Sequence, residues 1–169
     1  MVVYQTKECG VTLMQLLISL AIVAILAVLG IPSIIFLIEN NRVKAAAENF
    51  YQQANYARSE AVKKRSNTYL VVKSGSIWCV GINSTNDCDC SVTKNCSSGN
   101  VDSTEFKNVT LSTSGINNSN MMFDGLRGTT SGSGSATFTI NSKAVTVDIN
   151  SMGRVRICSN NVVGYPACS

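Results

Sequence analysis

The sequence contains no histidine, and only 14% of its 169 residues are charged. Without histidine the chain lacks the commonest general base and a common metal-binding side chain. Its few acidic residues are scattered, its serines and threonines have no base partner, and no glycine-rich phosphate loop follows an expected strand. These absences argue against an enzyme and give no indication of a cofactor or a catalytic site.

The net charge and the size of the folded part are also small. A net charge of +4 is far below that of a dedicated nucleic-acid-binding domain, so contact with a polyanion has to come from a local basic patch. The ~130 residues that follow the apolar N-terminal segment are enough for one compact domain and too few for two.

The longest uncharged segment runs from Val11 to Ile38 and consists mainly of leucine, isoleucine, valine and alanine. About 20 helical residues cross the ~30 Å hydrocarbon core of a membrane, so residues 11–38 are predicted to form a transmembrane helix. In a secretory signal peptide the apolar stretch is shorter and a small-residue cleavage site follows it. Here the small residue, Gly10, precedes the stretch. Residues 1–10 are therefore predicted to be a leader that is removed.

The helix is expected to continue beyond the apolar segment. Apolar residues recur every three or four positions, while the charged residues fall mostly off this stripe. The stripe consists of Val43, Ala47, Phe50, Ala54, Ala57 and Ala61. Lys63, Lys64 and Arg65 are expected to close the helix, because cations in a last turn complement the helix dipole. We favour this interpretation of the triplet over ligand binding.

After Asn67 the pattern changes to short runs of β-branched and aromatic residues, which predict an antiparallel sheet. The predicted strands are 68–72, 77–82, 106–111, 121–123, 136–140 and 144–149. Residues 141–143 are expected to form a tight turn, 83–104 a cysteine-rich loop without strands, and 131–135 a flexible loop. Trp78 is expected in the core. The predicted fold class is α+β, with one long helix packed on an antiparallel sheet and residues 39–169 forming the globular domain.

Cysteine usage indicates an oxidising compartment. Cys9 lies in the predicted leader, and an even set remains in loop-like sequence: Cys79, Cys88, Cys90, Cys96, Cys158 and Cys168. Such a set predicts up to three disulfides, for which the sequence leaves fifteen pairings open. We favour Cys158–Cys168, the only two in the tail. A zinc site of Cys88, Cys90 and Cys96 is the disfavoured alternative, since histidine and paired C-x-x-C spacing are missing.

Residues 10–17, Gly-Val-Thr-Leu-Met-Gln-Leu-Leu, resemble the prepilin cleavage motif of type IV pilins and pseudopilins. The resemblance implies the type IV pilin fold. It also implies that a prepilin peptidase cuts after Gly10 and that Val11 becomes the methylated N-terminus. Pro32 falls where these helices commonly carry a bending proline, which lacks an N–H donor and clashes with the preceding turn.

Gln15 departs from this family, which usually has glutamate at the fifth mature position. The resemblance assigns that carboxylate a partner in the terminal amine of a neighbouring subunit, and a carboxylate in an apolar bundle is costly without one. Gln15 forms hydrogen bonds but has no charge. This departure puts ordinary mid-filament packing in question and favours a rare or tip-located subunit.

Two further segments resemble the FimT/GspH-like minor pilins and pseudopilins. They are residues 57–63, Ala-Arg-Ser-Glu-Ala-Val-Lys, and residues 153–158, Gly-Arg-Val-Arg-Ile-Cys. In the FimT branch the resemblance implies that the second segment binds DNA during natural transformation. It also implies a single-pass protein of the bacterial inner membrane with a periplasmic domain, which joins a type IV pilus at the cell surface.

The residues of segment 153–158 are themselves suited to binding phosphate, apart from the resemblance. Residues two apart in a strand project to one side, so Arg154 and Arg156 are expected to share a face while Val155 points to the core. Guanidinium groups bind phosphate oxygens bidentately, and Gly153 allows a close backbone approach. The alternative is a pair of solvated edge arginines that block edge pairing. Lys143 and Arg127 are predicted as neighbouring DNA contacts.

Three functions follow. The one we favour is a minor pilin that binds double-stranded DNA for uptake, through electrostatic contacts that do not depend on sequence. The second is a structural minor pilin that primes or caps pili for adhesion and twitching. The third is a pseudopilin of a type II secretion system. All three imply contacts with other pilins through the N-terminal helix, the inner membrane before assembly, and the prepilin peptidase.

Overall fold

The computed structural model describes residues 12–92, 94–116 and 120–168, without the side chains of 28–33. Gly10 and Val11, where cleavage and methylation are predicted, lie outside the described residues, as does the side chain of Pro32. The chain divides into two compact units, Met1–Ile38 and Glu39–Ser169.

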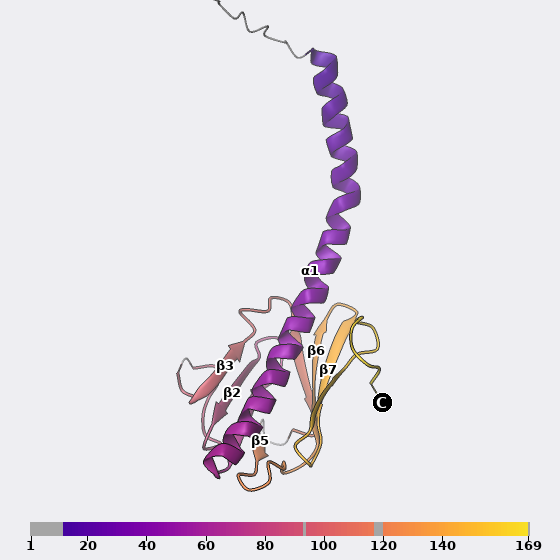
Figure 1. Ribbon diagram of the computed structural model, residues 1–169. Helices are drawn as coiled ribbons and strands as arrows, with labels where there is room; N and C mark the ends of the chain where they lie inside the picture. Colours follow the sequence, from indigo (N-terminus) through magenta and orange to yellow (C-terminus); the bar gives the residue numbers. More distant parts are fainter. Residues whose placement is uncertain (1–11, 93, 117–119, 169) are drawn as a thin grey trace, which may run out of the picture. The chain divides into compact units, whose positions relative to one another are not determined.

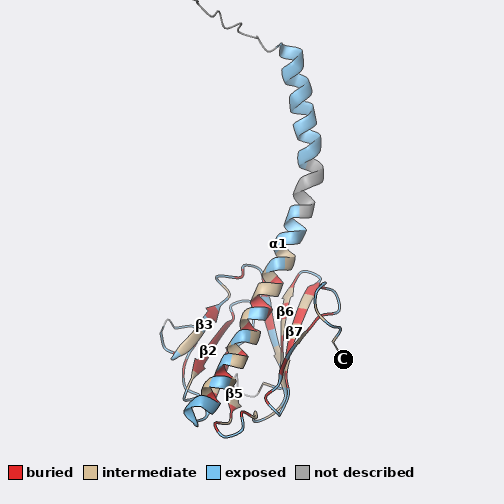
Figure 2. Cartoon of the chain, in the orientation of Figure 1, coloured by how far each residue is buried: buried red, intermediate tan, exposed pale blue. Residues whose placement is uncertain are grey.

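One helix, α1 (Leu13–Lys64), provides the regular structure of the first unit and continues into the second. Thr12 caps its start, since the Gln15 backbone N–H lies 3.3 Å from the Thr12 hydroxyl. Up to Ile38 the described side chains are exposed, Gln15 among them (Figure 2). Among the residues that the structure describes, no helical stretch combines the length and the apolar character of a membrane span. The role of residues 11–38 in the membrane stays a prediction.

The second half of α1 packs through the predicted stripe. Val43, Ala47, Ala54, Ala57 and Ala61 are fully buried, and Phe50 is 1% exposed. Most of these buried side chains are alanine, and Phe50 is the one large side chain of the stripe. The helix ends at Lys64, and Arg65 follows with a φ of 51°, as expected for a residue just past a helix. The predicted stripe and the predicted helix end are both confirmed.

The domain has two antiparallel sheets where a single sheet was expected (Figure 1). One sheet has the order β3-β2-β1-β5, and the other β4-β6-β7-β8. Their strands are β1 (Thr68–Lys73), β2 (Cys79–Asn83), β3 (Ser98–Asp102), β4 (Thr110–Ser114), β5 (Asn120–Phe123), β6 (Gly134–Ile140), β7 (Lys143–Ile149) and β8 (Val155–Cys158). The α+β class is confirmed, and the helix covers both sheets.

Three aromatic residues join the layers in one core. The Phe138 ring on β6 lies 5.7 Å from the ring of Phe50 on α1 and 5.2 Å from that of Trp78. Trp78 is 1% exposed, and its indole N–H donates a hydrogen bond of 2.8 Å to the Val109 carbonyl. The predicted core position of Trp78 is confirmed. Every buried residue of the described chain lies between Val43 and Val162, so the second unit contains the whole core.

Three strand predictions need correction. β3 lies inside residues 83–104, which were expected to contain no strand. The run 106–111 is not a strand until Thr110, because Val109 closes a turn on Phe106 while the Phe106 ring stacks on Trp78 at 5.8 Å. Gly134 and Ser135 belong to β6 and not to a flexible loop.

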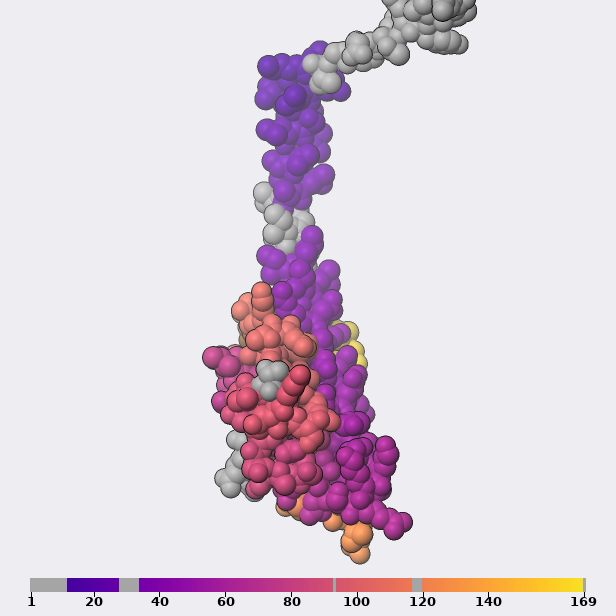
Figure 3. All heavy atoms as spheres, turned by 90° about the vertical axis from the view of Figure 1, so that its left-hand side faces the viewer, coloured from indigo at the N-terminus to yellow at the C-terminus, as the bar shows by residue number. Residues whose placement is uncertain are grey.

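The six cysteines after the predicted leader form three disulfides: Cys79–Cys90, Cys88–Cys96 and Cys158–Cys168. The first two cover the first sheet on its outer face, where they form a small second core with Val71. Gly81 on β2 has no room for a side chain, since a Cβ there would lie 2.6 Å from the Cys96 sulfur. Figure 3 faces this side of the domain, where residues between β1 and β4 form most of the surface. The predicted Cys158–Cys168 pair is confirmed.

Candidate functional site

The turn before β8 is built on Gly153. Its φ is +74°, and its N–H donates a hydrogen bond of 2.9 Å to the Asn150 carbonyl. The Arg154 backbone N–H in turn donates to the Asn150 side chain at 2.9 Å. A backbone conformation with positive φ favours glycine. The two hydrogen bonds to Asn150 hold this turn, and β8 begins directly after it.

The alternation predicted for the tail is confirmed. Val155 is 7% exposed and belongs to the core, while Arg154 and Arg156 on either side of it are exposed. β8 is the last strand of its sheet, paired only with β7. The structure therefore presents two guanidinium groups along one sheet edge.

The fold places one acidic residue beside the two tail arginines, although none follows Asp148 in the sequence. Asp148 on β7 is the cross-strand partner of Arg156. In the described part of the chain, however, neither Arg154 nor Arg156 forms an ion pair. Both guanidinium groups therefore remain available to an anionic ligand.

Gly153 is buried, so it allows two segments of the chain to pack closely and does not offer an open backbone to a ligand. A Cβ on Gly153 would lie 1.9 Å from the carbonyl oxygen of Gly128, in the turn before β6. The same carbonyl accepts a hydrogen bond of 3.1 Å from the Arg58 Nε atom on α1. The two segments that resemble the FimT/GspH-like proteins thus meet at Gly128.

Two surface grooves lie beside one face of α1. The first has a volume of about 770 Å³ and is lined by Tyr51, Asp148, Asn150, Cys158 and both tail arginines, Arg154 and Arg156, among others. The second, of about 640 Å³, is lined by Asn55, Arg58, Ser59, Val62, Lys63 and Arg127. Tyr51, Asn55, Arg58 and Val62 follow one another at steps of four and three, so they share a helix face.

We call the two grooves together the basic track. Its cations are Arg58, Lys63, Arg127, Arg154 and Arg156, and its one acidic lining residue is Asp148. From Tyr51 to Val62 the track follows about 16 Å of helix axis at 1.5 Å per residue. Arg127, predicted as a neighbouring contact, lines the second groove of the track, while the two tail arginines line the first.

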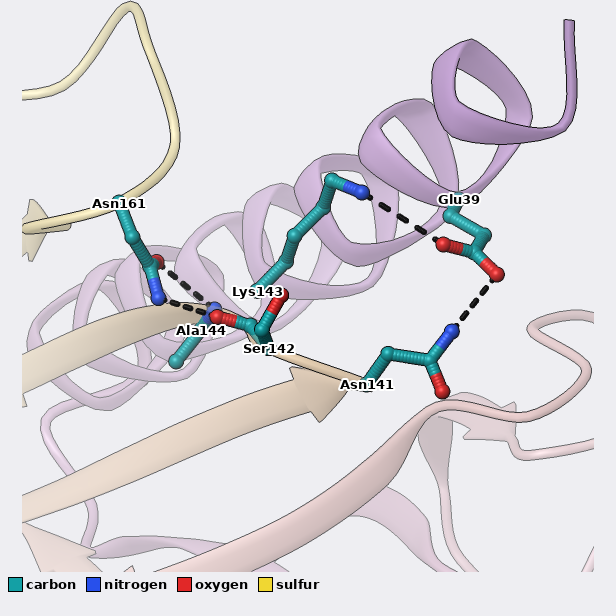
Figure 4. A network of polar contacts seen from close by, with 6 residues as sticks. All are labelled: Glu39, Asn141, Ser142, Lys143, Ala144 and Asn161. Atoms are coloured by element: carbon teal, nitrogen blue, oxygen red, sulfur yellow. Dashed lines mark hydrogen bonds and ion pairs between the residues drawn. The ribbon is translucent and has the colours of Figure 1, made fainter. Parts of the chain in front are cut away.

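Lys143 does not lie in the track. It begins β7, whereas Ile149, opposite Val155, ends this strand, and six residues of strand span about 20 Å. The Lys143 side chain is only 7% exposed, and its Nζ atom lies 3.5 Å from Glu39 on α1. Figure 4 shows the Glu39 carboxylate between Lys143 and Asn141, whose amide donates to it at 2.7 Å. Lys143 is buried in this structural contact and is not placed to bind DNA.

The Cys158–Cys168 disulfide closes a loop that forms one wall of the first groove, through Pro166 and Ala167. The loop is fastened to α1 by Tyr165, whose hydroxyl donates a hydrogen bond to the Glu48 carboxylate. Lys44 lies over the Tyr165 ring at 5.7 Å. Burial, followed by the hydrogen bond to Glu48, raises the pKa of Tyr165 well above its usual range, so the hydroxyl keeps the proton that it donates to Glu48.

The cysteines of the first sheet offer no thiolate to a metal. Cys88, Cys90 and Cys96, the residues of the alternative zinc site, are all in disulfides. Asp89 lies near Cys79 and Cys90, but these two are bonded to each other. The zinc alternative is therefore wrong.

The sequence alone did not identify Arg58, Tyr51 or Asp148 as lining residues of the candidate site. Arg58 stands inside the segment 57–63, whose resemblance was noted without a role for this side chain. The helical spacing of Tyr51, four residues before Asn55 and seven before Arg58, was the one feature of the sequence that placed it on the same helix face as these residues. No feature of the sequence placed Asp148 beside the tail arginines, because its position depends on the pairing of β7 with β8.

In a comparison with protein families, residues 46–153 match the family described as type II transport protein GspH. The matched segment includes Arg58, Gly128 and Gly153 and ends one residue before Arg154. No curated protein matches the chain significantly.

Among solved structures, the chain is similar to two crystal structures of the type IV minor pilin FimU of Pseudomonas aeruginosa PAO1. The crystal in space group P21 gives a TM-score of 0.51 at 19% identity, with 78% of this chain and 98% of FimU covered. The crystal in space group P65 gives 0.51 at 18% identity, with 75% and 99% covered. At these identities the similarity concerns the fold, and the fold is that of a type IV pilin.

Proposed function

Because the chain belongs to the family of the type II transport protein GspH, we propose that it is a minor pilin that binds the phosphate backbone of extracellular double-stranded DNA. The observation that carries the proposal is the pair Arg154 and Arg156, exposed on one strand edge and free of ion pairs within the described residues. Guanidinium groups without an intramolecular partner are suited to bidentate contact with phosphate.

The rest of the basic track supports binding that does not depend on sequence. Arg58, Lys63 and Arg127 line the groove that follows the same helix face. A row of cations over about 16 Å of helix axis suits several phosphates of one DNA strand. Phosphate contacts position a protein on DNA without reading its bases. The modest net charge of +4 is consistent with weak binding by one copy and stronger binding by several.

The proposal gives the chain no catalytic role, in agreement with a family and fold of pilin-like structural proteins. Its partners are DNA and other pilins, which α1 contacts through its apolar first half. Before assembly that segment is held in the inner membrane, and the prepilin peptidase cleaves after Gly10 and methylates Val11. The DNA bound by the domain is the substrate of uptake in natural transformation.

A second function is favoured by the family description itself, which names type II transport. A pseudopilin of a secretion system would use the same fold and the same helix-mediated assembly, and it would contact secreted proteins in place of DNA. A structural minor pilin that only primes pili would likewise bind no DNA. Both alternatives leave Arg154 and Arg156 as edge charges that block strand pairing.

The test of the proposal is the affinity of the Arg154→Gln/Arg156→Gln variant for a generic duplex. The full chain, in a non-ionic detergent with its disulfides formed, is titrated into a labelled 20-base-pair duplex at low salt. Each arginine is expected to contribute about 1 kcal/mol or more, so the double variant should bind roughly 10- to 100-fold more weakly.

The matched control is Lys73→Gln/Lys107→Gln, which removes the same charge from exposed positions outside the track. It should retain the affinity of the wild type within a few-fold. Equal losses in the two variants would mean that only net charge matters, and an absence of binding by the wild type would favour the structural or secretion function.

A further inference from the structure

The first groove contains more than the phosphate contacts of a duplex require. Its lining includes an aromatic residue, Tyr51, and an acidic residue, Asp148, beside the two arginines. Its volume of about 770 Å³ lies within the range of small-molecule sites. A binding site for phosphates alone has no need of an aromatic or an acidic residue.

Tyr51 has the placement of a stacking platform. Tyr51 is half-buried and packs against the core, which fixes its position, and it is also one of the residues that line the groove. Within the described residues its hydroxyl has no hydrogen-bond partner. An aromatic face beside cations that bind phosphate is the arrangement by which proteins hold unpaired bases.

Asp148 has the placement of a base-edge acceptor. In the part of the chain that the structure describes, its carboxylate pairs with no cation, although Arg156 is its cross-strand partner. The Cys158 sulfur lies 3.7 Å from its Oδ2 atom but donates no hydrogen bond, because it carries no proton in the disulfide. A free carboxylate repels phosphate, but it accepts hydrogen bonds from the exocyclic amino group of a base such as cytosine.

We infer that this groove binds an unpaired nucleobase that carries an amino group, so that the protein binds single-stranded DNA more tightly than a duplex. The base stacks on Tyr51, its amino group donates to Asp148, and the flanking phosphates contact Arg154 and Arg156. In a duplex both base faces are stacked and the amino group is paired, so Tyr51 and Asp148 have no partner. The inference rests on the proposed function and adds a base-binding site to it.

The test compares three labelled probes in fluorescence anisotropy with the full chain in non-ionic detergent: a 12-mer of cytidine, a 12-mer of thymidine, and a 12-base-pair duplex. The wild type should bind the cytidine strand at least ~5-fold more tightly than the duplex. Tyr51→Leu should weaken both single strands by roughly 5- to 100-fold, as loss of one stacked base predicts, and change the duplex less than twofold. Asp148→Asn should lower the preference for cytidine over thymidine.

Two controls keep the outcomes separate. Tyr56→Leu removes a tyrosine of the same helix that does not line the first groove, and it should change none of the three affinities. Tyr51→Phe keeps the ring and should keep single-strand binding, while the emission of Trp78, the only tryptophan, reports whether each variant is folded.

The inference is overturned if the wild type binds the duplex as tightly as the cytidine strand, or if Tyr51→Leu weakens all three probes equally. The proposed function fails by a different result, in which Arg154→Gln/Arg156→Gln binds every probe as well as the wild type. A protein in which the arginine variant loses binding and the Tyr51 variant does not would keep the proposed function and lose the base site.

Discussion

Replacing Gly153 by alanine is expected to destabilise the domain by about 3 kcal/mol or more. A φ of +74° costs a non-glycine residue about 1–2 kcal/mol. The added Cβ would also lie 1.9 Å from the Gly128 carbonyl oxygen, a backbone atom that cannot rotate away. Relief of this contact requires the turns before β6 and β8 to separate, which breaks the Arg58–Gly128 hydrogen bond and shifts both tail arginines.

The loss is measured by urea unfolding followed through the emission of Trp78, which is 1% exposed in the folded domain. The matched control is Gly132→Ala, because a Cβ at Gly132 has no atom within 4 Å. This control should change the free energy of unfolding by less than ~0.5 kcal/mol. If the two alanine variants are equally stable, the contact between Gly153 and Gly128 does not hold β8 in place.

Removal of the Cys158–Cys168 disulfide is expected to lower stability and DNA affinity together. The bond closes a short loop with a sequence separation of 10, and the chain-entropy estimate for such a loop is about 2.7 kcal/mol. Without it, the groove wall of Pro166 and Ala167 loses its covalent attachment and keeps only hydrogen bonds, among them the one from Tyr165 to Glu48 and the one from the Ser159 N–H to the Pro166 carbonyl. The Cys158→Ser/Cys168→Ser variant should therefore be less stable and bind DNA several-fold more weakly.

Cys88→Ser/Cys96→Ser separates the two effects. This pair has a similar sequence separation, 8, but lies on the outer face of the first sheet. Its removal should lower stability by a similar amount, about 2.5 kcal/mol, and leave DNA binding unchanged. Should both disulfide variants bind DNA equally well, the loop after β8 would be no part of the DNA site.

The elements predicted well from the sequence are those with a local pattern. The apolar stripe from Val43 to Ala61 and the cations at Lys63 and Lys64 follow from helix periodicity and the helix dipole, and both stand in the structure. The alternation around Val155 follows in the same way from strand geometry. The Cys158–Cys168 pair was predictable because no other cysteine lies near it in the tail.

The features that the sequence did not predict depend on contacts between distant segments. β3, Ser98–Asp102, has no β-branched run, and its pairing with β2 lies beside the disulfides that cover this sheet. Four cysteines lie close together between Cys79 and Cys96, so their pairing depends on three-dimensional positions. The division into two sheets depends on β4 pairing with β6, while β5, which lies between them in the sequence, pairs with β1 in the other sheet.

The candidate site illustrates the same limit. The segments 57–63 and 153–158 were recognised separately, and only the fold brings Arg58 and Gly153 together at the Gly128 carbonyl. Lys143 looked as available as Arg127 in the sequence, but Lys143 is buried beside Glu39 while Arg127 lines the track. The basic track is therefore a property of the fold and not of one motif.

The salt dependence of duplex binding tests the central claim most directly, because each phosphate contact releases counterions. For the wild type we predict that log Kd rises with the logarithm of the salt concentration with a slope of ~3 to 4, since each phosphate contact contributes ~0.9. Arg154→Gln/Arg156→Gln should reduce this magnitude by about 2, and Lys73→Gln/Lys107→Gln should leave it unchanged. Identical slopes for the wild type and the arginine variant would contradict the account, because Arg154 and Arg156 would then contact no phosphate.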